Sequence, residues 1–254
     1  HYFMTERIPS RPYAAITGVG GYIPPNRRSN TDLEQFCETS DEWIIKRTGI
    51  KERRILDENL ATSDMAVKAI QDLAKQYNKD LRDVDALIVA TSTPDMPMPA
   101  TANIILEKLG LTNVWAFDVN AACSGFLYAL DMASSLVETQ RYKNVLVVGA
   151  DNISTYVDLK DRSTNILFGD GAGAVVLGSG KNVGIMAIHT ASDGKGKEVL
   201  KCKAAPLFIN NEMLRKKIDE NTLEDNKGYL YMEGKEVFKF ASWAIEDTIK
   251  ILLD

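Results

Sequence analysis

The arrangement of apolar and polar residues along the chain predicts strands and helices in alternation. The run VDALIVATS (84–92) has an apolar centre, which is typical of a strand buried in a parallel sheet. Residues 63–77 carry apolar side chains at helical spacing, and Ser63 is predicted to cap that helix. The same signals predict strands at 14–24, 114–120, 144–151 and 174–180, and helices at 100–110 and 122–139. This order indicates an α/β layered fold whose sheets are mostly parallel or mixed.

The pattern then starts again in the last third of the chain. Residues 183–194 are strand-like, and after a polar insertion at 195–230 the helix predicted at 234–254 corresponds to that at 63–77. In the first half another strand follows that helix, whereas here the sequence stops at Asp254. We therefore expect a duplicated fold whose second half is incomplete. The expected divisions are 1–13 as a leader-like segment, 14–180 as the first half and 181–254 as the second half.

Composition and charge narrow the class of protein. With 254 residues, 45% of them hydrophobic, the chain can bury one large core or two fused halves. A net charge of −5 disfavours a nucleic-acid binder, which needs a basic face. No uncharged run approaches the roughly 18 residues of a membrane span, so we expect no membrane insertion. Three scattered cysteines predict reduced thiols in the cytoplasm rather than disulfides.

Cys123 lies among small residues where a predicted strand gives way to a predicted helix, in the stretch FDVNAACSGFLYAL (117–130). A thiol in the first turn of a helix faces unpaired N–H groups and the positive end of the helix dipole, which favour an anionic sulfur. The small neighbours would let a substrate carbonyl approach, and a main-chain N–H could donate to an oxyanion. The alternative is a small buried core residue. Neither Cys37 nor Cys202 has a comparable setting.

The segment TSDEWIIKRTGIKERR (39–54) predicts a binding surface. Trp43 and Arg47 are four residues apart, so on a helix they share a face and could hold an adenine ring with nearby phosphates. A basic patch around them would attract phosphates or an acidic carrier protein. The residues of this patch are Lys46, Arg47, Lys51, Arg53 and Arg54. The alternative is a core tryptophan beside ordinary solvated charges.

Two other features predict structure rather than chemistry. The stretch GDGAGAVV (169–176) is not a G-x-G-x-x-G motif and precedes a strand, so it does not predict a dinucleotide site. Its glycines are expected to allow close backbone packing. His189 is expected on a strand, as a structural histidine and not as a base.

Three motifs occur together and in order, namely TSDEWIIKRTGIKERR, DVNAACSGFLYAL and ILFGDGAGAVVL (166–177). On these motifs the chain resembles the β-ketoacyl-acyl-carrier-protein synthase III family from about Ala14 onward. The resemblance implies a thiolase fold and an acyltransferase that begins fatty-acid synthesis. It also implies that Cys123 takes an acyl group from acyl-coenzyme A and condenses it with malonyl-acyl carrier protein, in a homodimer without a metal or other cofactor.

The same resemblance implies roles for further residues. It places four residues in the coenzyme A site, which are Thr39, Trp43, Arg47 and Arg162. It places Met98 and Phe168 in the acyl pocket, with Met98 reaching the pocket of the partner subunit. The family often has an aromatic residue at the position of Met98. A flexible methionine there leaves the preferred acyl length open.

One departure from the family concerns its condensing chemistry. The family uses a histidine and an asparagine in its C-terminal part, and neither His1 nor His189 matches that histidine. We expect the missing residues beyond Asp254. Two alternatives stay open: another thiolase-fold ketosynthase or acyl-group loader that shares Cys123, and a non-catalytic subunit that pairs with a complete one.

Overall fold

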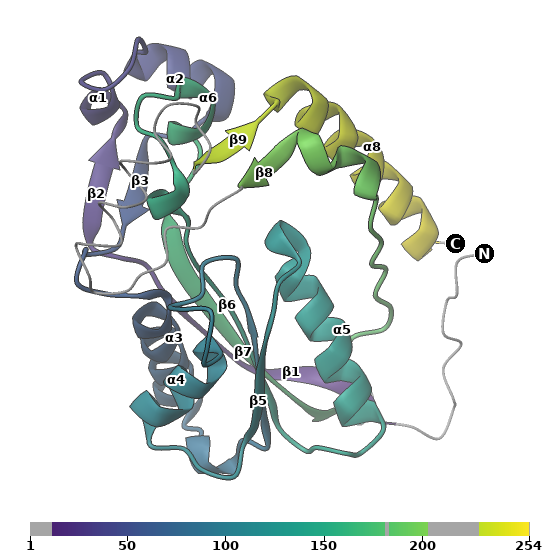
Figure 1. The fold of residues 1–254 in the computed structure, drawn as a ribbon. Helices are drawn as coiled ribbons and strands as arrows, with labels where there is room; N and C mark the ends of the chain where they lie inside the picture. The colour runs from purple at the N-terminus through teal and green to yellow at the C-terminus, as the bar shows by residue number, and fades with distance from the viewer. Residues whose placement is uncertain (1–11, 181–182, 203–228, 254) are drawn as a thin grey trace.

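A five-stranded sheet in the order β1-β7-β6-β4-β5 forms the centre of the structure (Figure 1). The computed structural model describes residues 12–180, 183–202 and 229–253. Most of the leader-like segment and most of the polar insertion therefore lie outside the described residues. The strands are β1 (Tyr13–Tyr22), β4 (Ala86–Ala90), β5 (Trp115–Val119), β6 (Val145–Asn152) and β7 (Asp170–Gly180).

The sheet is mixed, which is one of the two arrangements expected from the sequence. Strands β5, β4 and β6 pair in parallel, whereas β6, β7 and β1 pair antiparallel. The reason lies in the connection at 153–169, which leaves the sheet beside Asn152 and returns beside Asp170, its partner in the ladder. Because this connection does not cross over the sheet, β7 runs back along β6.

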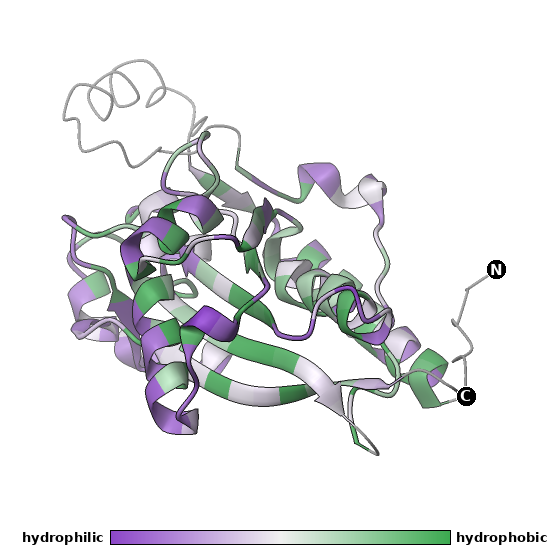
Figure 2. Cartoon of the chain, turned by 90° about the horizontal axis from the view of Figure 1, so that it is seen from below, coloured by the Kyte–Doolittle hydropathy of each residue, from purple (hydrophilic) through white to green (hydrophobic). Residues whose placement is uncertain are grey.

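Helices cover both faces of the sheet, as the apolar pattern predicts. Helices α3 (Thr62–Tyr77) and α4 (Thr101–Leu109) lie on one face, and α5 (Gly125–Glu138) lies on the other (Figure 1). In β4, Leu87 and Val89 pack toward α3 and α4, and the alternate side chains pack toward α5. Figure 2 shows the apolar strands between these helices. Burial on both faces explains the uninterrupted apolar run of β4.

The start and end of the predicted helices are only partly as expected. Gly110 ends α4 in the left-handed conformation, with φ of 65°, as the sequence predicts. Ser63 does not cap α3, because the helix begins after Ala61, whose N–H donates to Asp64 at 2.8 Å. Ser63 instead lies inside the first turn, where its N–H and hydroxyl both donate to Asp95.

A small two-stranded sheet and three helices lie beyond one edge of the large sheet (Figure 1). These elements are β2 (Asn26–Ser29), α1 (Asn30–Leu33), α2 (Asp41–Thr48), β3 (Glu52–Ile55) and α6 (Arg162–Asn165). Leu33, Ile44 and Ile166 form their buried apolar cluster. Gly169 packs against β3, where an added Cβ would lie 2.9 Å from the Arg54 carbonyl oxygen. The expected close backbone packing is thus confirmed at Gly169 but not at Gly173, where an added Cβ would meet nothing within 4 Å.

The last part of the chain departs from the predicted repeat. Residues 183–193 form no strand, so the strand expected at 183–194 is wrong, and His189 lies on an irregular segment. The Ile185 N–H of this segment donates to the carbonyl of Ala14 on β1 at 2.8 Å. The helix predicted at 234–254 is confirmed as α8. The remaining elements are η1 (Leu81–Asp83), η2 (Ala122–Ser124), η3 (Ile153–Tyr156), η4 (Gly194–Glu198), β8 (Leu200–Cys202), β9 (Leu230–Met232) and α8 (Gly234–Leu253).

No helix in the described ranges has both the length and the apolar character needed to cross a membrane.

Candidate active site

The carboxyl ends of the three parallel strands meet at one edge of the sheet. Ala90 of β4 lies opposite both Val119 of β5 and Gly149 of β6. The residues that follow these positions are therefore neighbours, and they include Asn120, which directly follows β5. Such an edge is where open α/β sheets bind ligands.

Cys123 lies four residues beyond the end of β5, at this edge, and its side chain is exposed. It sits in the 3-10 turn η2, which continues directly into α5, so the thiol precedes the α-helix and does not lie within its first turn. Ala122 before it has φ of 48°, a left-handed conformation that is uncommon for a residue other than glycine. Strained backbone of this kind concentrates at functional sites. Cys123 is thus an accessible thiol on a sharp turn, and the interpretation as a buried core residue is wrong.

A polar cluster that the sequence analysis missed lies beside this turn. Asp151, on β6, accepts a hydrogen bond from the Ser92 N–H at 2.7 Å. Burial raises the pKa of Asp151, and the hydrogen bonds that it accepts oppose this shift. Burial also raises the pKa of Tyr156, whose hydroxyl donates to the Ser92 carbonyl at 3.1 Å. Ser92 and Tyr156 follow buried strands and Asp151 lies near the carboxyl end of one, and these positions were the available signal for them.

A second cluster brings together residues that are far apart in the sequence. The Arg47 guanidinium carbon lies 3.9 Å from the centroid of the Trp43 ring, and that of Arg162 lies 4.4 Å from it. Arg162 also donates to the Glu38 carbonyl at 2.8 Å, which ties α6 to the chain before α2. Thr39 lies in the same stretch, and its buried hydroxyl has no hydrogen-bond partner among the described residues. An aromatic ring, two cations and an unpartnered hydroxyl can contact a flat, anionic ligand.

Comparisons with known proteins identify the family to which the chain belongs. Residues 117–194 match the family described as 3-oxoacyl-[acyl-carrier-protein (ACP)] synthase III. The chain is 43% identical over 242 residues to the β-ketoacyl-[acyl-carrier-protein] synthase III of Laribacter hongkongensis, covering 95% of this chain and 72% of that protein. The chain belongs to the β-ketoacyl-acyl-carrier-protein synthase III family.

Solved structures of the synthase III family show the same fold. The 3-oxoacyl-(acyl carrier protein) synthase III of Pseudomonas aeruginosa has a TM-score of 0.81 and 36% identity, over 95% of this chain and 70% of that chain. A priming β-ketosynthase of a polyketide pathway has a TM-score of 0.80 and 33% identity, over 93% of this chain and 68% of that chain. The expectation of a thiolase-like α/β fold is confirmed, and the enzyme is an acyltransferase of fatty-acid synthesis.

The basic patch expected on this synthase is smaller than the sequence suggests. Arg53 is only 4% exposed, and its guanidinium donates to Asn30 and to the Ile166 carbonyl. Burial lowers the pKa of Arg53, and the charge of Arg28 lowers it further. Arg54 pairs with Glu52 at 3.1 Å. Arg53 is therefore a structural residue that joins β3 to the residue after α6.

The two predicted acyl-pocket residues lie on separate segments. Met98 is 80% exposed on the loop between β4 and α4, and Phe168 is half-buried just before β7. Neither belongs to the three apolar clusters of the described residues. The structure thus does not bring Met98 and Phe168 together with Cys123 in one apolar cluster.

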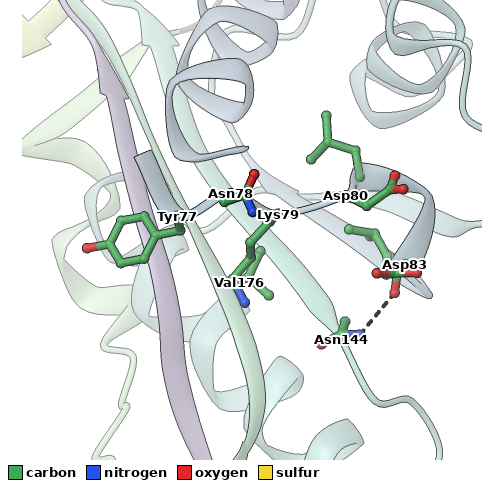
Figure 3. A pocket seen from close by; sticks show the side chains of 9 residues that line it. Tyr77, Asn78, Lys79, Asp80, Asp83, Asn144 and Val176 are labelled. Carbon is green, nitrogen blue, oxygen red and sulfur yellow. Dashed lines mark hydrogen bonds between the residues drawn. The ribbon is translucent and has the colours of Figure 1, made fainter. Parts of the chain in front are cut away.

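A cavity elsewhere in the fold has no connection with these groups. It has a volume of about 210 Å³ and lies between the end of α3 and the amino ends of β4 and β6, with Lys79, Asp83 and Asn144 in its lining (Figure 3). The candidate site lies at the opposite, carboxyl ends of the same strands. Parallel strands present their chemistry at the carboxyl end, so we assign no function to this cavity.

Proposed function

We propose that Cys123 is the acyl-accepting nucleophile of this β-ketoacyl-acyl-carrier-protein synthase III. Its sulfur attacks the thioester carbonyl of an acyl-coenzyme A, the new C–S bond forms, and coenzyme A leaves as its thiol. Malonyl-acyl carrier protein then loses CO₂, and this decarboxylation leaves a carbanion. The carbanion attacks the carbonyl carbon of the acyl-cysteine, the C–S bond breaks, and the cysteine sulfur is released. The observation that carries this proposal is the exposed thiol on the strained turn between β5 and α5.

Oxyanion stabilisation at this site is supported by the turn itself. The Ala122 N–H donates to Asn120 Oδ1, and the Ser124 N–H donates to the Ala121 carbonyl. The Cys123 N–H between them donates to no acceptor in the described part of the chain. We propose that it donates to the oxygen of the tetrahedral intermediate, as main-chain donors do in acyl-transfer enzymes.

The coenzyme A moiety is proposed to bind at Thr39, Trp43, Arg47 and Arg162. In the structure Arg162 covers the Trp43 ring itself, and we propose that an adenine ring inserts between them. The unpartnered Thr39 hydroxyl supports this site, because a buried polar group without a partner is costly until a ligand supplies one.

We expect Trp43→Ala to weaken coenzyme A binding by about 1–3 kcal/mol, because base–aromatic stacking contributes about that much. Arg47→Ala is expected to weaken binding by a similar amount through the loss of a charge-assisted contact. Titration calorimetry with coenzyme A measures both. Ile45→Ala, on the same helix and 36% exposed, is the control that should leave affinity unchanged. Normal binding by Trp43→Ala, or unfolding of that variant, would show that the ring is a core residue.

Met98 and Phe168 are proposed to border the acyl pocket, with Met98 contributed to the partner subunit. The exposure of Met98 supports this proposal, since an apolar side chain that is 80% exposed is available to another molecule. A panel of straight and branched acyl-coenzyme A thioesters, read by intact mass, identifies the acyl group that Cys123 accepts. The second candidate function is that of a priming ketosynthase, which the structural similarity to a polyketide enzyme favours. The same panel of thioesters tests it.

We further propose that the enzyme is a cytoplasmic homodimer whose interface includes β5. This strand is at the edge of the sheet in the described residues, and Trp115 at its start is 47% exposed while stacked on Tyr142. An exposed edge strand with aromatic side chains is suited to pairing with another chain. Cys37, Cys123 and Cys202 form no disulfide in the part of the chain that the structure describes, which agrees with a reducing compartment.

Trp115→Lys is expected to convert the dimer to a monomer, because it places a charge in the apolar interface. Sedimentation velocity over a range of concentrations measures this change. Tyr77→Lys is the matched control, since Tyr77 is 48% exposed but lies at the end of α3, away from β5. A Trp115→Lys protein that stays dimeric would exclude β5 from the interface.

A further inference from the structure

The polar cluster between β4 and β6 has no part in the acyl transfer described above. Asp151 Oδ1 accepts from the Ser92 N–H at 2.7 Å, the Thr91 hydroxyl at 3.2 Å and the Thr93 hydroxyl at 3.3 Å. Tyr156, which is 5% exposed, holds the Ser92 carbonyl. Both main-chain groups of Ser92 are thus fixed, by the half-buried Asp151 of β6 and by the buried Tyr156 of η3.

The side chain of Ser92 connects this hydrogen-bonded cluster to the residue that follows β5. Its hydroxyl donates to Asn120 Oδ1 at 3.4 Å, and the same oxygen accepts from the Ala122 N–H at 3.3 Å. Ala122 has the left-handed φ of 48° that sets the direction of the chain into Cys123. Hydrogen bonds on both sides of Ser92 therefore connect the half-buried Asp151 to the strained residue before the thiol.

We infer that Ser92 and Asn120 are positioning residues that hold the turn at Ala122 and so present Cys123 to the substrate. This inference rests on the proposed role of Cys123. A left-handed alanine persists only where its surroundings hold it. The Asn120 oxygen supplies that support from within the loop, and Ser92 fixes the orientation of the Asn120 amide.

The direct test compares Ser92→Ala with Ser92→Thr, which keeps the hydroxyl. Ser92→Ala retains the N–H and carbonyl contacts to Asp151 and Tyr156, so it removes only the contact to Asn120. We expect it to lower kcat for acyl transfer to Cys123 about tenfold, a barrier change of about 1.4 kcal/mol. KM for acyl-coenzyme A should stay within about twofold, and Ser92→Thr should recover most of the rate.

A second pair of variants acts at Asn120 itself. Asn120→Asp keeps the oxygen that accepts from Ala122 and is expected to remain active, whereas Asn120→Ala is expected to be slow. Ser134→Ala is the matched control, because it removes one serine hydrogen bond within α5, to the Leu130 carbonyl at 2.7 Å, away from the turn. Thermal unfolding of each variant separates a loss of rate from a loss of fold.

Alkylation of Cys123 by iodoacetamide gives a readout that does not depend on acyl transfer. Ser92→Ala and Asn120→Ala should change its rate several-fold, while Ser134→Ala should not. A Ser92→Ala protein with the wild-type rates, or a Ser92→Thr protein as slow as Ser92→Ala, would overturn the inference. Acylation of another residue in the wild-type protein would instead refute the proposed function, and the alkylation rates would still decide the positioning role.

Discussion

Cys123→Ala is expected to abolish acyl-enzyme formation and with it all β-ketoacyl product. The substitution removes the only atom proposed to form the covalent intermediate, so the rate should fall by several orders of magnitude. Because the thiol is exposed and its neighbours are small, the fold should tolerate alanine within about 0.5 kcal/mol. Intact mass after incubation with acyl-coenzyme A measures the adduct, and circular dichroism measures the fold.

The other two cysteines are the natural controls for this experiment. Cys37 is half-buried and contacts the Asn165 amide at 3.3 Å, and Cys202 is half-buried on β8. Cys37→Ala and Cys202→Ala should therefore acquire one acyl group at the wild-type rate. An adduct that persists in Cys123→Ala and disappears in either control would assign the nucleophile elsewhere.

The elements that the sequence predicts best are those whose signal is local. The apolar run of β4 reflects burial on both faces, and the spacing of α3 reflects a single buried face. The orientation of β7 could not be predicted in this way. It depends on whether the connection from β6 crosses the sheet, and residues 153–169 carry no pattern that decides it. The strand expected at 183–194 failed for a similar reason, since a strand needs a neighbouring ladder as well as apolar residues.

In the candidate site, too, the local contacts could be predicted from the sequence and the long-range contacts could not. Trp43 and Arg47 are four residues apart on one helix, so their contact followed from spacing alone. Arg53 was expected on the surface, because a sequence shows a charge but not the two acceptors that bury it. Ser92, Asn120 and Asp151 were missed, since each is an ordinary polar residue until parallel pairing places the three strand ends together.

The second large effect is expected at Gly20, where β1 and α3 approach most closely. A Cβ on Gly20 would lie 2.4 Å from the Leu73 nitrogen and 2.5 Å from the Ala69 carbonyl oxygen. Both atoms belong to the helix backbone, so α3 itself would have to move. We expect Gly20→Ala to lower the free energy of unfolding by about 3 kcal/mol, the upper part of the usual range for overpacking. Thermal and urea unfolding measure this loss.

Gly21 on the same strand is the matched control for that substitution. A Cβ there would meet only the Ala172 carbonyl oxygen at 3.6 Å, an ordinary contact, so Gly21→Ala should change stability by less than about 0.5 kcal/mol. Equal stability of the two variants would show that α3 does not pack against β1 as the structure has it.

Displacement of α3 should also change the position of residues in the candidate active site. Thr62, in the first turn of α3, donates to the Thr93 carbonyl at 2.6 Å, and Thr93 in turn donates to Asp151. If the new Cβ in Gly20→Ala displaces α3, the hydrogen bond from Thr62 should displace the segment that contains Thr93 and Ser92. We expect acyl transfer to Cys123 to be slower in folded Gly20→Ala than in Gly21→Ala, measured well below the unfolding temperature of both. Identical rates in the two folded proteins would show that the position of α3 is not coupled to the turn that presents the thiol.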